Sequence, residues 1–154
     1  MSRYLLVAVA LMAAAGFALA GSAGVKAEVV GGTVAAVPTK AGARLDLTGA
    51  EALVLHHRAG ELRVPYGKIN TLEYGQHVSR RYAAAVLISP VLLLSKSRRH
   101  YVTVGYTDAD ERQQALVFRV EKGDIRSVLA SLEARTGRRL EYQDDEARKS
   151  GKGS

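Results

Sequence analysis

The four histidines are the first residues to consider for chemistry, because imidazole is a common metal ligand and changes its charge near neutral pH. They are His56, His57, His77 and His100. His56 and His57 are adjacent, so on a strand they would point to opposite faces and could not easily share one ion. The other two stand apart, and no H-x-H or H-E-x-x-H spacing occurs. We therefore predict no metal site at the histidines.

A second candidate is the carboxylate cluster Asp108, Asp110 and Glu111. It lacks the twelve-residue calcium-loop pattern, and its strand–turn–strand setting is typical of a solvated hairpin tip. No G-x-S-x-G or S-x-x-K motif accompanies a serine, and no glycine-rich phosphate loop occurs. The chain has no cysteine, which excludes thiol catalysis, thiolate zinc sites and iron–sulfur clusters. We predict that the protein is not an enzyme and carries no cofactor.

The strongest functional feature is an uncharged apolar segment, residues 82–94 (YAAAVLISPVLLL), with basic residues on both sides. If this segment is exposed, its apolar side chains could enter a membrane interface while the cations meet anionic headgroups, at about 1 kcal/mol per cation. The candidate surface or partner contacts are Arg80, Arg81, Leu87, Ile88, Leu92, Leu93, Lys96, Arg98 and Arg99.

The same apolar segment has two other interpretations. It could pack over the rest of the domain as part of the core, or it could contact another protein or subunit, since a large exposed apolar patch usually marks an interaction site. It is not a transmembrane helix: as a helix it would span about 20 Å, less than the ~30 Å hydrocarbon core. Pro90 would also bend it.

Residues 1–27 are typical of a targeting segment. Arg3 is followed by the apolar run 5–19, and then by small residues that suit a signal peptidase. Cleavage after Ala20, Ala23 or Ala27 fits the pattern, and an uncleaved membrane anchor is the alternative. We therefore expect an exported protein, periplasmic or extracellular, with or without membrane association.

Short runs with period-two alternation follow, separated by turns that contain glycine or polar residues, which predicts a mainly β domain. On the sixth run, Val102, Val104 and Tyr106 are expected to face the core, while Thr103 and Gly105 face solvent. A turn at 58–60 and a polar turn at 108–112 indicate two hairpins. The expected strands are 29–37, 43–48, 51–57, 61–64, a run through 72–74, 101–107 and 114–120.

A single helix is expected at about 124–137. Asp124 is placed to cap its first turn through the side-chain carboxylate, and Gly137 suits a left-handed end. The remaining residues, 143–154, are polar and are predicted to be a disordered tail. The apolar stripe of the helix has the spacing of a buried face, and it consists of Ile125, Val128, Leu129 and Leu132.

About seven short antiparallel strands followed by one C-terminal helix resemble bacterial pleckstrin-homology-like (PH/GRAM-like) domains. The resemblance is carried by the stretches GELRVPYGKINTLEYG, HYVTVGYTDADERQQALVFRV and DIRSVLASLEARTG. It implies an antiparallel β-sandwich or barrel over residues 28–142, closed at one end by the helix. It also implies a role in binding lipids, peptides or proteins. The phosphoinositide-binding members carry basic residues in the first hairpin loop, where this chain has only Lys40 and Arg44, which argues against that ligand.

The formal charge of +7, from 22 Lys and Arg against 15 Asp and Glu, favours acidic partners. Few aromatic residues and no nucleic-acid-binding motif argue against nucleic acid. We predict an exported, non-enzymatic binding or scaffold module of the cell envelope that contacts an anionic membrane surface through residues 80–99. The alternative is a structural subunit, or a protein-interaction domain, that uses the same segment. The sequence leaves the oligomeric state open.

Overall fold

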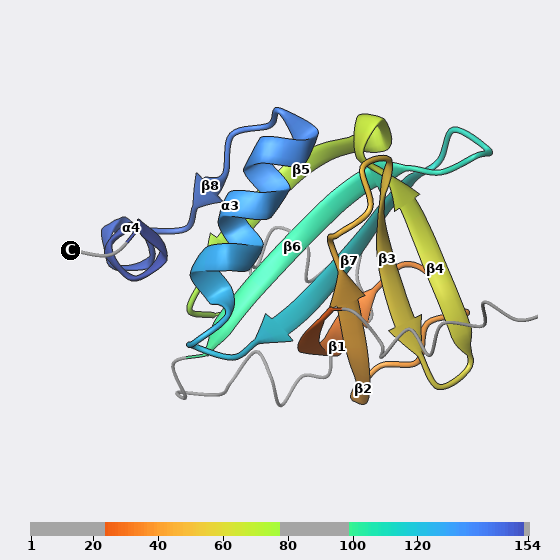
Figure 1. Ribbon diagram of the computed structural model, residues 1–154, viewed down its shortest axis with the longest axis horizontal. Helices are drawn as coiled ribbons and strands as arrows, with labels where there is room; N and C mark the ends of the chain where they lie inside the picture. The colour runs from red at the N-terminus through yellow and green to blue at the C-terminus, as the bar shows by residue number, and fades with distance from the viewer. Residues whose placement is uncertain (1–23, 78–98, 153–154) are drawn as a thin grey trace, which may run out of the picture.

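The computed structural model describes residues 24–77 and 99–152. Most of the expected targeting segment and the whole apolar segment 82–94 lie outside these residues. Figure 1 shows a mainly β molecule with two α helices among its described residues. The elements are β1 (Val25–Gly32), β2 (Ala41–Asp46), β3 (Ala52–His57), β4 (Gly60–Pro65), the short 3₁₀ helix η1 (Tyr66–Lys68), β5 (Ile69–Gly75), β6 (His100–Thr107), β7 (Gln113–Val120), α3 (Ile125–Thr136), β8 (Glu141–Tyr142) and α4 (Asp145–Lys152).

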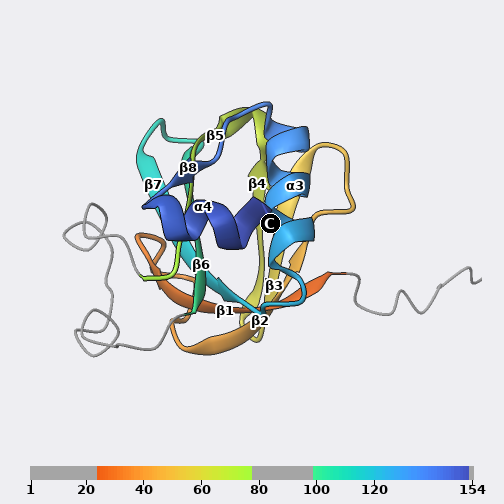
Figure 2. The ribbon, with the colours of Figure 1, turned by 90° about the vertical axis from the view of Figure 1, so that its left-hand side faces the viewer.

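The eight strands form one sheet in the order β4-β3-β2-β1-β7-β6-β5-β8. All neighbours are antiparallel except β8, which runs parallel to β5. The sheet is strongly bent, so that β2–β4 and β5–β7 form two walls joined through β1 (Figures 1 and 2). The prediction of a mainly β fold is confirmed. The expected all-antiparallel pairing and single helix are wrong, because β8 is parallel and α4 follows it.

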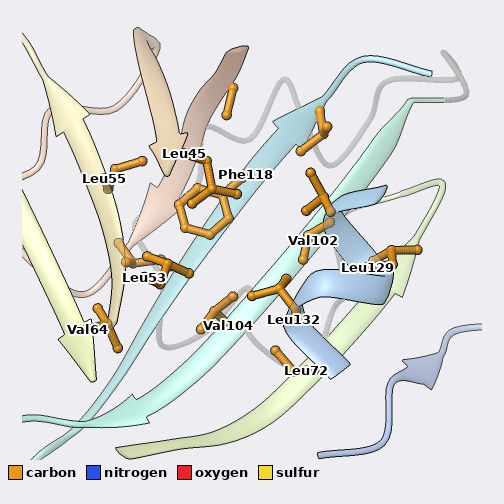
Figure 3. Packing of buried hydrophobic residues seen from close by; sticks show 14 of the residues in the cluster. Leu45, Leu53, Leu55, Val64, Leu72, Val102, Val104, Phe118, Leu129 and Leu132 are labelled. Atoms are coloured by element: carbon orange, nitrogen blue, oxygen red, sulfur yellow. The ribbon is translucent and has the colours of Figure 1, made fainter. Parts of the chain in front are cut away.

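The hydrophobic core lies between the two walls and α3 (Figure 3). Both predicted hairpins are present, since β3 pairs with β4 around residues 58–59 and β6 pairs with β7 around 108–112. The predicted apolar stripe of α3 is buried, which confirms that its 3.6-residue period faces the core. Side chains seen in the core include Leu45, Leu53, Leu55, Phe118, Leu72, Val102, Val104, Leu129 and Leu132.

The two ends of α3 differ in how well the sequence predicted them. Gly137 is left-handed at φ 65°, and its N–H donates to the Glu133 carbonyl at 2.9 Å, as a glycine end requires. Asp124 precedes the helix, but its carboxylate makes no capping hydrogen bond. It has right-handed helical angles (φ −100°, ψ −16°) because it continues the turn begun at Glu121, whereas a capping residue adopts extended angles.

The outward face of β6 also departs from expectation. Thr103 and Gly105 were expected to face solvent, yet both are buried. They lie on the face opposite the core, and this second face is itself apolar, because Val30, Tyr101 and Val117 are buried there too. The alternating pattern placed Thr103 and Gly105 on the correct face of β6. The pattern does not show whether that face is exposed to solvent or buried.

The C-terminal segment is ordered where a disordered tail was predicted. Residues 145–152 form α4, and Ala147 is fully buried against the core. Gly151 is buried as well, close to the rings of Tyr142 and Tyr74. At the other end of the chain, β1 begins at Val25, inside the expected targeting segment 1–27.

Candidate functional site

Eight of the nine contact residues predicted from the sequence lie outside the described residues. The ninth, Arg99, is exposed and directly precedes β6. Its backbone N–H donates to the carbonyl of Gln76 at 3.3 Å, which holds together the two ends of the chain around residues 78–98. The structure therefore places Arg99, the last residue of the predicted basic surface, beside the end of β5.

A groove of about 590 Å³ lies along one side of strands β1, β2, β3 and β7. Its volume is within the range of small-molecule sites, ~300–1,000 Å³. Four permanent cations line it, against two carboxylates, and two histidines add further donors. The lining residues are Lys26, Ala27, Glu28, Gly42, Ala43, Arg44, His56, His57, Arg58, Arg119 and Glu121.

The pairing register brings three of these residues into one row across the sheet. Lys26 is paired with Arg44, and Arg44 is paired with His56. Side chains directly opposite on neighbouring antiparallel strands are about 4.5–5.5 Å apart at Cβ, and like charges in such pairs are destabilising. The Lys26–Arg44 pair is therefore unfavourable for the fold itself, and places where a sequence violates a local rule are commonly functional.

Some charged side chains in the groove are paired with other groups, and others have no partner among the described residues. Arg119 donates to Glu28 in an ion pair between partly buried side chains. Arg44 donates through Nη1 to the carbonyl of Gly24 at 3.3 Å, which leaves most of its guanidinium N–H groups available. The side chains of Lys26 and Arg58 are exposed and make no hydrogen bond or ion pair to a described residue.

The two adjacent histidines have different surroundings. His56 Nδ1 is 3.6 Å from Glu61 Oε2, and His56 Nε2 is 4.0 Å from Asp46 Oδ2. Hydrogen bonds from the side chain and the backbone of Thr48 lower the pKa of Asp46, and His56 contributes less, so this carboxylate stays ionised beside the ring. His57 Nδ1 is buried with no hydrogen-bond partner. His57 is paired with Ala43 of the core, so its side chain lies on the opposite face of β3 from that of His56.

The carboxylates at 108–111 belong to the tip of the β6–β7 hairpin. Asp108 accepts hydrogen bonds from the backbone N–H groups of Asp110 and Arg112, both at 2.9 Å, and from Gln114 Nε2 at 2.7 Å. Arg112 also donates to Asp110 Oδ2 at 2.6 Å. Within residues 24–77 and 99–152, no three His, Asp or Glu side chains are grouped as metal ligands. In the same ranges, no helix combines the length and apolarity that crossing a membrane requires.

No protein-family model, curated protein or solved structure matches this chain. The functional argument therefore rests on the geometry of the groove. Sequence reasoning missed it because its residues come from separate strands, and Lys26 of β1, Arg44 of β2 and His56 of β3 become neighbours only through the strand register. The only sign in the sequence was a basic residue in each of these strands, which alone does not indicate a shared site.

Proposed function

We propose that the protein is an exported, non-enzymatic binding module that holds an anionic group of the cell envelope in the groove lined by β1, β2, β3 and β7. The observation that carries this proposal is the direct pairing of Lys26 with Arg44. A bound anion between the two side chains would convert their repulsion into two charge-assisted hydrogen bonds. The open side chain of Arg58 supplies a further contact to the same ligand.

Phosphate-bearing headgroups are the anions that fit this arrangement best. Arginine and lysine donors together suit a phosphate group, which accepts several hydrogen bonds at once. Burial raises the pKa of Tyr101, while Arg119, Arg99 and Glu28 act on it as nearby charges. Arg119 lines the groove, so this groove cation and Arg99 both lie near Tyr101.

We also propose that the fold is PH-like. A bent sheet with a C-terminal helix against its core supports a PH-like architecture, in which a non-catalytic binding role is expected. The alternative is a structural subunit, or a protein-interaction domain, that uses the apolar segment 82–94. Salt separates the two: contacts between cations and headgroups weaken steeply as salt rises, whereas an apolar protein interface is nearly insensitive to it.

The test is flotation of the exported protein with phosphatidylglycerol or phosphatidylcholine vesicles, from about 50 to about 500 mM salt, a range over which the Debye length falls severalfold. The variant is Lys26→Glu with Arg44→Glu. We expect binding to phosphatidylglycerol vesicles that falls with salt, and about a tenfold or greater loss in the variant, since each near-surface cation contributes about 1 kcal/mol.

The matched control is Arg126→Glu with Arg138→Glu, which changes the net charge equally at exposed positions in and after α3. It should keep most of the binding if the groove is the site. Equal losses in both double variants would mean that only net charge matters, and unchanged binding in the groove variant would remove the proposal. Circular dichroism of each variant shows whether it is folded.

A further inference from the structure

A second cavity lies at a different place in the fold and shares no lining residue with the groove. It has a volume of about 690 Å³ and lies between residues 33–35, β4, η1 and the tip of the β6–β7 hairpin. This volume is again within the range of small-molecule sites, ~300–1,000 Å³. Figure 1 shows the tip of this hairpin near the end of β4, on the side of the molecule away from α4.

One wall of this cavity is apolar. Val34, Ala35, Leu62, Pro65 and Tyr106 line it. Tyr106 is 5% exposed, and Val34 and Leu62 are partly buried against the hydrophobic core. An apolar ligand at these residues would contact side chains that already pack against the hydrophobic core. Burial of apolar surface is the main source of affinity in such sites.

The polar residues that line the cavity already bond to one another. Both carboxylate oxygens of Asp108 accept two hydrogen bonds each, from Asp110, Arg112 and Gln114. Thr33 Oγ1 donates to Gln114 and accepts the N–H of Ala115 at 3.0 Å. The hydrogen bonds that Asp108 accepts lower its pKa, and the bond from Gln114 contributes most. The Asp108 carboxylate therefore stays ionised and hydrogen-bonded within the hairpin tip. These polar residues thus offer little to a cationic ligand.

The open charge at the mouth is positive. Lys68 is exposed at the end of η1, lines the cavity, and makes no hydrogen bond or ion pair to a described residue. Arg63 also lines the cavity, and its contact with Glu61 is a long 3.7 Å between largely exposed side chains, which binds it weakly. An apolar wall beside an open ammonium group suits a ligand with an apolar chain and one anionic head.

We propose that this cavity binds a single-chain amphiphile with an anionic head group, of the medium-chain carboxylate type. The chain lies along Val34, Leu62 and Tyr106, and the head group meets Lys68. The site is independent of the anionic groove, because its ligand is selected by an apolar chain as well as by charge. The protein would then carry two recognition sites, one for an anionic group and one for an amphiphile.

The test uses n-octanoate and n-octylammonium, which share a chain length and differ in the sign of the head group, and follows amide resonances of the exported protein by NMR. Octanoate should shift the amides of Val34, Leu62 and Tyr106 in a saturable way. Octylammonium should bind more weakly, with a Kd about tenfold higher. No saturable shift at these amides, or equal affinity for both compounds, would overturn the proposal.

Two variants locate the ligand within the cavity. Lys68→Ala should weaken octanoate binding about fivefold to tenfold, because a hydrogen bond to a charged group is lost, and should strengthen octylammonium binding, because a repelling cation is removed. Ala35→Phe, at an exposed loop position, should fill the cavity and weaken both compounds. The groove variant Lys26→Glu with Arg44→Glu should bind octanoate like the wild type. Octanoate binding that survives both cavity variants in folded protein would show that the ligand lies elsewhere.

Discussion

At the scale of single residues, a buried hydrogen-bond chain attaches the C-terminal helix to the sheet. The hydroxyl of Tyr74 lies 2.6 Å from His100 Nδ1 and 2.8 Å from Ser150 Oγ, and Ser150 Oγ donates to the carbonyl of Ala147 at 3.1 Å. Each hydroxyl has one proton to donate. Since the Ser150 proton goes to Ala147, the Tyr74 proton goes to Ser150, and His100 must donate from Nδ1. The network thus assigns the Nδ1–H tautomer.

The burial of His100 leads to a prediction on pH. Burial, with a smaller contribution from Lys122, lowers the pKa of His100 below its usual 6.5, against an opposing effect of Glu121. Below the unfolded pKa the unfolded chain binds more protons than the folded one, so the free energy of unfolding falls as pH decreases from about 6.5 toward the folded pKa. His100→Gln should flatten this part of a urea-denaturation series measured against pH.

The matched control is His77→Gln, because His77 is exposed and near the end of β5. Its pH profile should follow the wild type. The lowered pKa values of Asp46 and Asp108 affect stability in a separate window, below about pH 4, where these carboxylates take up protons. A wild-type profile that is flat between about pH 5 and 7 would contradict the role given to His100.

At the scale of elements, the sequence predicted what depends on local pattern. The stripe of α3 and the glycine at 137 are local features, and both were predicted correctly. β8 was missed because a two-residue strand has no periodicity, and it pairs in parallel with β5 from far along the chain. Helix α4 was missed because Ala147 and Gly151, four residues apart, are small and sparse on an otherwise polar segment.

The small size of Gly151 is what allows α4 to lie close to the core. A Cβ atom at this position would be 2.9 Å from Tyr142 Cε1, 3.2 Å from Tyr74 Cε1 and 3.3 Å from Leu129 Cδ1. Gly151→Leu should therefore release α4 from its site, since overpacking of this kind typically costs about 1–3 kcal/mol. Hydrogen exchange of the amides in α4 should become about tenfold faster or more, while the amides of β6 and β7 keep their protection.

The control for this prediction is Lys149→Leu, which introduces the same side chain at an exposed position of α4. It should leave the exchange rates close to those of the wild type. Fast exchange in the wild type itself, equal to that of Gly151→Leu, would mean that α4 is not held by the contacts of Gly151.

At the scale of the whole molecule, β1 is the strand on which both halves of the sheet depend. It pairs with β2 on one side and with β7 on the other, in the middle of the strand order. It also supplies Lys26 to the groove. The groove could not be predicted from the sequence, because its lining residues become neighbours only when β1 pairs with both β2 and β7.

The central place of β1 would limit where the proposed export signal could be removed. Cleavage after Ala27 would remove Val25, which pairs with Leu45, and Lys26. It would also remove the Gly24 carbonyl that accepts a hydrogen bond from Arg44. If the protein is exported as proposed, we expect the mature chain to begin at Gly21 or Gly24, the residues that follow Ala20 and Ala23. The intact mass of the exported protein distinguishes these starts from one at Glu28.

Two purified chains test the structural reason for this limit. A chain that begins at Gly24 retains every β1 pair, whereas one that begins at Glu28 loses the pairs of residues 25–27 with β2 and the pair of Ala27 with Val120 of β7. The shorter chain should therefore melt at a lower temperature and lose binding to phosphatidylglycerol vesicles together with Lys26. Equal melting temperatures would mean that the start of β1 contributes little to joining the two halves. If the two chains melt at the same temperature and only the shorter one fails to bind vesicles, residues 25–27 contribute to the groove through Lys26 and not to the stability of the sheet.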